Sequence, residues 1–345
     1  MDRTAILPYR EDDSTEQEIN AWLPQRLLEP PRAWAREARG SSVTRHGPLT
    51  QRKGADVDVG ILLLFDGRPG LTLGDCARRA KELEDMGFPS LWVPDHVVTF
   101  ENYQPLYSYS PDGLPPWTGR QGWYDPLWVL AAAASTTSRI RLGTSVVILP
   151  ERNPVLFAKE VVALDHLSNG RVDIGVGVGW CPEEYAALGV PFERRGDRAD
   201  EYITAMRRLW TEDLATMHGE FVDFTDVVAL PKPIQRPSPP LIVGGQSPAA
   251  FRRVAKQGDG WISWMLPPDQ LKRSIDALNL ECERHDRDPA TVRKIGALLY
   301  SGADDMRRYF EIGRDNGMHE YVVLPWASEG YPSESIAEIA QYRDD

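Results

Sequence analysis

The sequence has few cysteines, no long apolar run and no excess of basic residues. Its three cysteines (Cys76, Cys181 and Cys282) lie far apart and form no C-x-x-C pair, which argues against a disulfide framework or a cysteine zinc site. No apolar run reaches the roughly 18 residues of a membrane-spanning helix, and residues 1–13 lack the apolar core of a signal peptide. We therefore expect a protein of the reducing cytoplasm without a membrane segment.

Acidic residues outnumber basic residues, 51 against 39, and the net charge is −12. A nucleic-acid-binding protein usually carries a basic face, so nucleic acid is not an expected partner. Residues 1–57 hold nine acidic and nine basic residues, so the whole acidic excess lies in 58–345. This balance and the weak periodicity of residues 1–57 predict a separate N-terminal extension, either mobile or packed as a latch on the following domain or on a partner subunit.

From residue 58 onward, apolar strand patterns alternate with helix patterns. Thr72 and Asp75 form a predicted capping box at the start of the first helix. Three later helices share another start signal, a capping side chain followed by proline, at 125–126, 153–154 and 247–248. Eight apolar strands are predicted, at 59–65, 90–93, 140–149, 171–178, 241–243, 260–263, 295–300 and 320–324.

Apolar strands that alternate with helices pair in parallel through right-handed crossovers. Eight such units predict a closed (β/α)₈ TIM barrel over residues 58–330, and the alternative is an open doubly wound sheet. A helix at 197–210 and a short β-like piece at 220–224 form an insertion between the fourth and fifth strands. Residues 331–345 are then a C-terminal tail.

In such a barrel the active site lies at the C-terminal ends of the strands. His96 follows the second strand directly after Asp95, and an imidazole exchanges protons near neutral pH, as an acid/base step requires. Asp95 either orients His96 or caps the loop, and the alternative for His96 is a loop histidine bonded to backbone. His166 lies at a helix end and is interpreted as structural. No spacing of histidines and carboxylates indicates a metal site, so we expect none.

Glycines mark two further strand ends. The turn 244–247 opens a helix after the fifth strand, where free N–H groups and the helix dipole attract a phosphate. Because the barrel part is acidic, we expect anion binding to rest on this backbone rather than on a basic patch. Glycines 175, 177 and 179 face one side of the fourth strand, and they leave room either for a flat ring or for a crowded core layer.

The segment 99–124 is long and rich in aromatic residues and proline. Loops longer than about 15 residues are uncommon in compact domains and are often functional. This one is either an aromatic lid over an apolar substrate or a loop packed for stability or dimerisation.

Several motifs occur together in one order along residues 58–265. They are LWVPDHV at 91–97, YSPDG at 109–113, DPLWVLAAAASTTSRIRLGTSVVILPERNPVLFAKEVVALDHLSNGR at 125–171, VDIGVGVGWCPEEYAALGVPFERRGDRADEY at 172–202, PKPIQRPSPPLIVGGQSPAAFRRVA at 231–255 and GDGWI at 258–262. With these motifs the chain resembles the luciferase-like monooxygenase superfamily, and most of all its branch of oxidoreductases that depend on the deazaflavin coenzyme F420.

The resemblance implies a barrel whose strand ends hold an isoalloxazine or deazaisoalloxazine ring. It places Asp95 and His96 beside the ring as the catalytic pair, and it implies a non-proline cis peptide in the third strand. The cofactor-binding positions that it implies are Ser145, Val146, Gly177, Gly179, Trp180, Gly244, Gly245, Gln246 and Ser247. Sugar-phosphate dehydrogenases of the F420 branch carry an acid at the position of Trp180, and this departure favours an apolar substrate.

The activity implied by the resemblance is that of an F420-dependent oxidoreductase, which transfers a hydride between coenzyme F420 and a small, apolar organic substrate. In this interpretation His96, held by Asp95, supplies or accepts a proton. The alternatives are an FMN-dependent monooxygenase that uses reduced flavin and oxygen, and a flavin-binding protein without turnover. A homodimer through an apolar patch is compatible with the net charge, and the sequence leaves the oligomeric state open.

Overall fold

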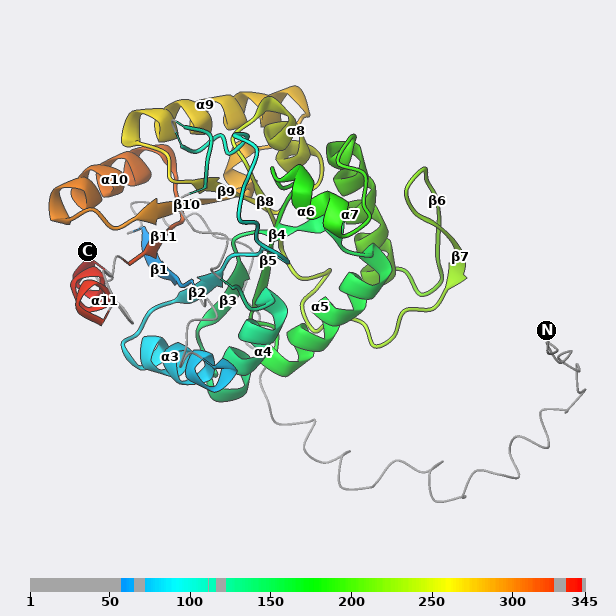
Figure 1. Cartoon of the computed structure of the whole chain (residues 1–345), viewed down its shortest axis with the longest axis horizontal. Coiled ribbons are helices and arrows are strands. Elements are labelled where there is room, and N and C mark those ends of the chain that lie inside the picture. Colours follow the sequence, from blue (N-terminus) through cyan, green and yellow to red (C-terminus); the bar gives the residue numbers. More distant parts are fainter. Residues whose placement is uncertain (1–56, 65–71, 111, 116–121, 326–332, 343–345) are drawn as a thin grey trace, which may run out of the picture. The chain divides into compact units, whose positions relative to one another are not determined.

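Eight parallel strands form a closed barrel in the computed structural model, which describes residues 57–64, 72–110, 112–115, 122–325 and 333–342. The strands are β1 (Asp58–Leu62), β2 (Ser90–Val93), β3 (Arg141–Thr144), β5 (Val172–Gly177), β8 (Leu241–Gly244), β9 (Gly260–Trp264), β10 (Arg293–Leu299) and β11 (Glu320–Leu324). In the order β3-β2-β1-β11-β10-β9-β8-β5 each strand pairs in parallel with its neighbours, and a β3–β5 pairing closes the circle (Figure 1). The predicted (β/α)₈ barrel is confirmed, and closure excludes the open sheet. Residues 1–56 of the predicted extension lie outside the described residues.

Helices surround the barrel on its outer side (Figure 1). They are α3 (Leu73–Asp85), α4 (Pro126–Thr136), α5 (Pro154–Ser168), α7 (Arg195–Thr211), α8 (Pro248–Gln257), α9 (Pro268–Arg284) and α10 (Ala303–Asn316), with a one-turn η3 (Pro289–Thr291). Thr72 and Asp75 form the predicted capping box. The caps that precede proline also accept hydrogen bonds from first-turn amides, and they are Asp125, Asn153 and Ser247. These side chains bind amides that have no partner inside the helix.

The predicted third strand is interrupted. β3 ends at Thr144, and β4 (Val147–Ile148) continues it and pairs with β5. The peptide bond between Ser145 and Val146, which lies in the gap, is cis, as the resemblance implied. A single turn, η2 (Leu149–Glu151), then leads towards α5.

Short elements outside the eight repeating units differ from the sequence-based expectation. They are α6 (Pro182–Ala187), the antiparallel hairpin strands β6 (Ala215–His218) and β7 (Asp223–Val227), and α11 (Ser333–Ile339) with the one-turn η4 (Ala340–Tyr342). The hairpin replaces the predicted single β-like piece, and α11 lies in the predicted tail, where Ile336 and Ile339 are buried with the core. Within the described residues, no helix combines the length and the apolar character needed to cross a membrane.

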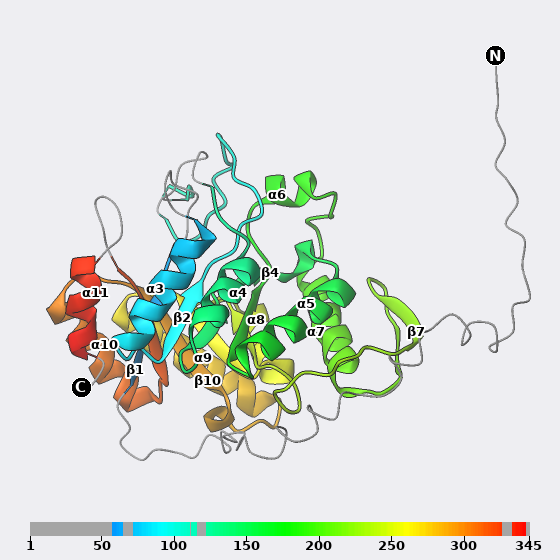
Figure 2. The ribbon, with the colours of Figure 1, turned by 90° about the horizontal axis from the view of Figure 1, so that it is seen from below.

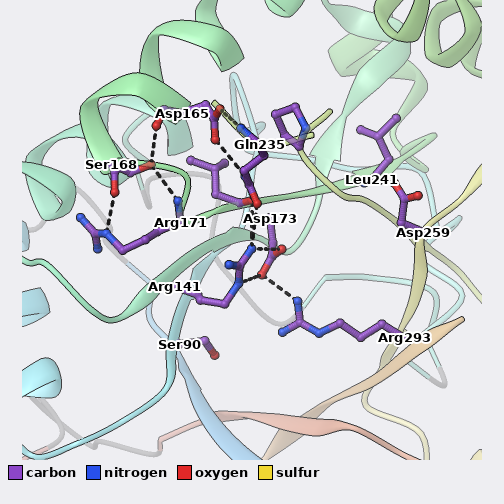
Figure 3. Close-up of polar contacts among 12 residues, drawn as sticks. Ser90, Arg141, Asp165, Ser168, Arg171, Asp173, Gln235, Leu241, Asp259 and Arg293 are labelled. Atoms are coloured by element: carbon purple, nitrogen blue, oxygen red, sulfur yellow. Dashed lines mark hydrogen bonds and ion pairs between the residues drawn. The ribbon is translucent and has the colours of Figure 1, made fainter. Parts of the chain in front are cut away.

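A network of charged side chains fills the N-terminal end of the barrel (Figure 3). The carboxylate of Asp173 accepts hydrogen bonds from Arg141 (2.5 and 2.8 Å) and from Arg293 (2.8 Å), and Arg293 also binds Glu320 at 2.6 Å. Burial by itself would raise the pKa of Asp173, but the two guanidinium groups outweigh it and hold that pKa well below its ordinary value. The hydroxyl of Ser90 donates to Glu320. Each of these residues is the first or second residue of its strand. Their side chains therefore form one layer across the N-terminal end of the barrel.

Apolar side chains fill the barrel between this network and the other end. Together they form one buried cluster, which consists of Leu62, Trp92, Ile242, Ile262, Ile295, Ala297 and Val322. Trp92 is fully buried, and its indole N–H donates to the hydroxyl of Ser90 at 2.8 Å. Each large apolar side chain buried here stabilises the fold by roughly 1.5–3 kcal/mol. The interior is therefore packed, and open space is found at the C-terminal ends of the strands.

Candidate active site

A cavity of about 890 Å³ lies at the C-terminal ends of the strands. Its walls come from the ends of β2, β4, β5, β8 and β9 and from the segment that follows β2. Figure 2 shows this segment, in cyan, and α6 at the same end of the barrel. All predicted site residues line this cavity: Asp95, His96, Ser145, Val146, Gly177, Gly179, Trp180, Gly244, Gly245, Gln246 and Ser247. The structure thus brings together residues that are spread over 153 positions of the chain.

His96 is held by Glu184 of α6 and not by Asp95. The Nδ1 atom of His96 lies 2.8 Å from Oε2 of Glu184, whose side chain is fully buried. The other oxygen of Glu184 accepts hydrogen bonds from the amides of Val97 (2.6 Å) and Val98 (3.3 Å). A carboxylate only accepts hydrogen bonds, so the proton between the two side chains belongs to Nδ1 and leaves Nε2 as the nitrogen that can accept a proton.

Asp95 has a different partner, which corrects the prediction that it orients His96. Its oxygens accept hydrogen bonds from Arg152 at 2.9 and 3.0 Å and from the amide of Ile148 at 3.1 Å. Arg152 also binds Asp125, the cap of α4, at 2.8 Å. Burial raises the pKa of Asp95, although the guanidinium of Arg152 opposes this shift. Asp95 therefore joins β2, β4 and α4 beneath the cavity, because its carboxylate is turned to Arg152.

Glu151 is a further buried carboxyl group near this site. Both of its carboxylate oxygens are buried and have no hydrogen-bond partner in the described part of the chain. Burial raises its pKa to about 9, and the negative charges of Glu184 and Asp95 add to the shift. Glu151 therefore carries its proton at neutral pH.

The glycines of β5 and β8 make room for the side chain of Val146. A Cβ atom would lie 2.6 Å from a Val146 methyl group at Gly177, and 2.9 Å from one at Gly244. Both glycines line the cavity, so their backbones form part of its floor beside Val146. At Gly175, by contrast, a Cβ atom would lie 1.8 Å from the carbonyl oxygen of Thr144, and this residue does not line the cavity. The crowded-layer interpretation is correct for Gly175.

Aromatic side chains form the opposite wall of the cavity. Tyr107 packs edge-on against Trp180 with 5.1 Å between ring centroids, and Trp123 packs in the same way against His96 at 5.0 Å. The indole N–H of Trp264 donates to the hydroxyl of Tyr107 at 3.0 Å, and burial raises the pKa of Tyr107 to about 12. The segment 99–124 therefore lines the site, although its residues 111 and 116–121 lie outside the described residues.

The cavity lining also includes cationic side chains that the sequence did not predict. Besides the turn 244–247, its lining includes Arg194, Arg195 and Arg253. Arg253 binds Asp200 at 2.5 Å, and Arg194 binds the carboxylates of Asp197 and Glu220. Arg195 donates from Nε to the carbonyl of Gly179 at 3.3 Å and has no carboxylate partner among the described residues. The expectation that anion binding rests on the backbone of the turn 244–247 stays a prediction, and Arg195 is a second candidate for an anion in the same cavity.

A model of the luciferase-like monooxygenase family matches residues 57–312, well over half of the chain. The chain belongs to this family of oxidoreductases and monooxygenases. The uncharacterized protein Rv0953c of Mycobacterium tuberculosis is 40% identical over 202 residues, which cover 59% of this chain and 71% of the relative.

Two relatives named for an activity use different cofactors. An F420-dependent glucose-6-phosphate dehydrogenase of Intrasporangium calvum is 29% identical, and the match covers 76% of this chain and 83% of that protein. An FMNH2-dependent dimethylsulfone monooxygenase of Pseudomonas putida is 32% identical over 46% of this chain and 44% of that protein. Family membership therefore shows that the protein is an enzyme whose relatives use F420 or FMN. It does not decide which of these two cofactors this chain uses.

Solved structures agree on the fold. Monooxygenase RslO1 from Streptomyces bottropensis has a TM-score of 0.69 at 21% identity, covering 84% of this chain and 98% of its own. The F420-dependent tetrahydromethanopterin reductase from Methanopyrus kandleri has a TM-score of 0.63 at 17% identity, with the same two coverages. Both support the barrel assignment.

Proposed function

We propose that the protein is an F420-dependent oxidoreductase that transfers a hydride between coenzyme F420 and a small, apolar organic substrate. The observation that carries the proposal is the pairing of His96, in the wall of a large cavity, with the buried carboxylate of Glu184. Hydride transfer to or from a carbonyl carbon requires a proton at the oxygen, and a histidine held in one tautomer supplies that exchange. When bound, F420 supplies or accepts the hydride.

The residues present fit a long, flat cofactor with an anionic end. The backbone of Gly177 and Gly244, with Val146 between them, offers a surface that a ring can approach closely. The turn 244–247 offers the N-terminal end of α8, and Arg195 adds a guanidinium without a carboxylate partner among the described residues. These groups would hold the ring and the phosphate respectively.

His96 performs the proton step in this proposal. Glu184 accepts the Nδ1 hydrogen bond, so Nε2 takes a proton from a substrate hydroxyl in the oxidising direction and returns it to the oxygen in the reducing direction. Glu184 fixes the ring because it also binds the amides of residues 97 and 98. It is the orienting group that was predicted at Asp95.

The aromatic wall supports an apolar substrate. Trp180, Tyr107 and Trp123 gather around His96, and a carboxylate that could bind sugar hydroxyls is missing at position 180. Edge-on aromatic contacts leave ring faces and edges for a planar or aliphatic group. The same wall keeps water away from the place where a hydride would move.

The test is to titrate the purified protein separately with F420 and with FMN. We expect saturable F420 binding that His96→Ala leaves within about tenfold and that Arg195→Ala weakens by more, because an ion pair with phosphate is lost. Tight FMN binding with oxygen-dependent turnover, and no F420 binding, would overturn the proposal. That result favours the FMN-dependent monooxygenase, the second candidate, which the Pseudomonas putida relative supports.

A third hypothesis is that the protein binds a flavin without turnover. It is distinguished by adding reduced F420 and a panel of apolar ketones, quinones and enones to wild type and His96→Ala. Cofactor binding by both proteins, with no substrate-dependent oxidation of reduced F420 by either, would favour this hypothesis.

A further inference from the structure

The β6–β7 hairpin lies outside the eight repeating units and packs on α7. Figure 1 shows it outside the circle of barrel helices. Met217 and Val222 of the hairpin are buried with Ala205 of α7 in a small apolar cluster of their own. Arg208 of the same helix donates a hydrogen bond to the backbone carbonyl of Thr216. The hairpin is therefore fixed to α7, the helix that brings Arg195 to the active-site cavity.

A carboxylate of α7 holds the turn 219–222, which is called the hairpin tip below. The oxygens of Glu201 accept hydrogen bonds from three consecutive amides, those of Glu220 (3.1 Å), Phe221 (2.7 Å) and Val222 (2.6 Å). A Cβ atom at Gly219 would lie 1.9 Å from this carboxylate, so the glycine makes room for it. The hairpin tip therefore has a defined position along α7.

The hairpin tip contacts two arginines at the start of α7. The guanidinium groups of Arg194 and Arg198 lie over the ring of Phe221, at 5.1 and 4.8 Å from its centroid. Glu220 binds Arg194 at 2.5 Å. Arg198 is buried and also donates to the carbonyl oxygen of Pro191 at 2.7 Å. These contacts hold the first turn of α7 from the hairpin.

Arg195 belongs to this same first turn and lines the cavity. Arg194, directly before it, has a left-handed backbone (φ 56°), which is uncommon for a residue with a side chain and persists where surrounding contacts impose it. The guanidinium of Arg195 lies 3.9 Å from the ring centroid of Phe192, and its Nε donates to the carbonyl of Gly179 at 3.3 Å. Its two terminal nitrogens make no hydrogen bond to any residue that the structure describes. They are the donors that a ligand can use.

We propose that the β6–β7 hairpin positions Arg195 for the phosphate of the cofactor, and this inference rests on the proposed function. Phe221 and Glu220 are then positioning residues, because they act on Arg195 through Arg194 and the first turn of α7. A guanidinium that is fixed in advance loses less conformational freedom when it binds an anion. Without the hairpin contacts, Arg195 keeps its charge and loses its fixed direction.

The charge of Glu220 gives the inference a characteristic sign. By charge alone, a carboxylate near a phosphate site opposes phosphate binding, so Glu220→Gln should strengthen it slightly. As a positioning residue Glu220 has the opposite effect, because its removal releases Arg194. The direction of the change in phosphate affinity therefore separates the two roles.

The experiment compares ligands that differ by one phosphate group. One pair is riboflavin and FMN. The other pair is 8-hydroxy-5-deazariboflavin, which has the ring system of F420, and its 5′-phosphate. Fluorescence titration gives the dissociation constants, and the ratio within each pair, called the phosphate ratio below, separates the phosphate from the ring.

Five proteins are compared. Wild type and Arg195→Ala bracket the phosphate ratio, and Phe221→Leu and Glu220→Gln test the hairpin tip. The matched control is Phe224→Leu, which changes another ring of the same hairpin that carries no arginine over it in the described structure.

For each ring that binds, we expect wild type to favour the phosphorylated ligand by about tenfold or more, because hydrogen bonds to a charged group are the strong ones. Phe221→Leu should lower the phosphate ratio by about two- to fivefold, which corresponds to one exposed cation–π contact, and leave the affinity for the phosphate-free ligand unchanged. Glu220→Gln should also lower the ratio, Arg195→Ala should lower it most, and Phe224→Leu should keep it.

A wild-type phosphate ratio in Phe221→Leu, or an equal fall in Phe224→Leu, would overturn the inference. A rise in Glu220→Gln would also overturn it, because Glu220 would then act by its charge alone. If Phe221→Leu does not fold, Glu220→Gln decides the matter, since it changes an exposed side chain. Binding of the flavin pair alone would overturn the proposed cofactor, and the FMN-to-riboflavin ratio would still decide the inference. Binding of neither pair would overturn both.

Discussion

The two ends of the barrel both contain buried charges, but they use them differently. At the N-terminal end, Asp173 and Glu320 meet Arg141 and Arg293 in a layer in which these charges bind one another. At the C-terminal end, the charged groups surround a cavity of about 890 Å³, and Glu151 is left without a hydrogen-bond partner in the described structure.

The difference shows which end is built for stability and which for chemistry. A network that satisfies its own groups offers a ligand nothing to bind. At the other end, Glu184 holds His96 and Asp95 holds Arg152, and the cavity wall keeps groups that can still exchange protons or bind anions. Substitutions at the two ends should therefore separate folding stability from activity.

The largest effect should follow from breaking the N-terminal network. Arg293→Leu leaves Glu320 without its guanidinium partner and removes one of two from Asp173, and loss of one partner of a buried pair costs about 3–5 kcal/mol. Urea denaturation measures the free energy of unfolding. The control Arg307→Ala removes an exposed pair on α10 and should cost less than about 1 kcal/mol. Equal losses in the two variants would show that the network is not a stability element.

The opposite result is expected at His96. Under the proposed function, His96→Ala should lower turnover by about 10²–10⁴-fold, because it removes a proton-transfer group. It should cost less free energy of unfolding than Arg293→Leu, because Glu184 keeps its hydrogen bonds from the amides of Val97 and Val98. Steady-state rates with reduced F420 and denaturation curves measure the two quantities. Unchanged turnover would remove His96 from the mechanism.

A smaller effect, of opposite sign, is expected at Glu151. Its pKa is raised from 4.5 to about 9 in the folded protein, so the unfolded chain loses its proton first and stability falls as pH rises between these values. Glu151→Gln stays uncharged, and it should be more stable than wild type at pH 8 by about 1–2 kcal/mol, a few degrees in melting temperature. At pH 5 the difference should nearly vanish.

Thermal denaturation at both pH values tests this prediction, with Glu193→Gln, at an exposed position, as the control without a pH-dependent difference. A variant that is less stable than wild type at pH 8 would mean that Glu151 is ionised and paired. The C-terminal end of the barrel would then also contain a buried charge bound to an opposite charge, as the N-terminal end does.

The smallest effect concerns the aromatic wall. Trp264→Phe removes the N–H that donates to Tyr107 and should cost about 0.5–1.5 kcal/mol. A double-mutant cycle with Tyr107→Phe measures the coupling. If the hydrogen bond connects the two side chains, the double variant should lose less stability than the sum of the two single losses. Strictly additive losses would mean that the hydrogen bond contributes nothing and that packing alone stabilises this wall.

The sequence predicts the parts of the molecule that repeat. Apolar runs and proline-preceded caps mark strands and helices, so the barrel and its strand-end residues could be located in advance. The partner of His96 could not, because Glu184 lies 88 positions away on a six-residue helix that is too short for a periodic signal. Arg195 was missed for a related reason, since α7 delivers it to the cavity only through tertiary packing. Asp95 was assigned to His96 because they are adjacent in sequence, yet neighbouring residues often point to different partners.

The filled N-terminal end has a kinetic consequence. Side chains occupy the barrel from the charge network up to the cavity floor, so ligands reach the floor of the cavity from its C-terminal mouth. When one molecule rests on this floor and a second lies above it, the upper one covers the way out of the lower one. The one that rests on Val146 and Gly177 is the first to arrive and the last to depart, and the one against Trp180 comes and goes above it. Turnover would then follow a compulsory order of addition, with the upper molecule exchanging while the lower one stays in place.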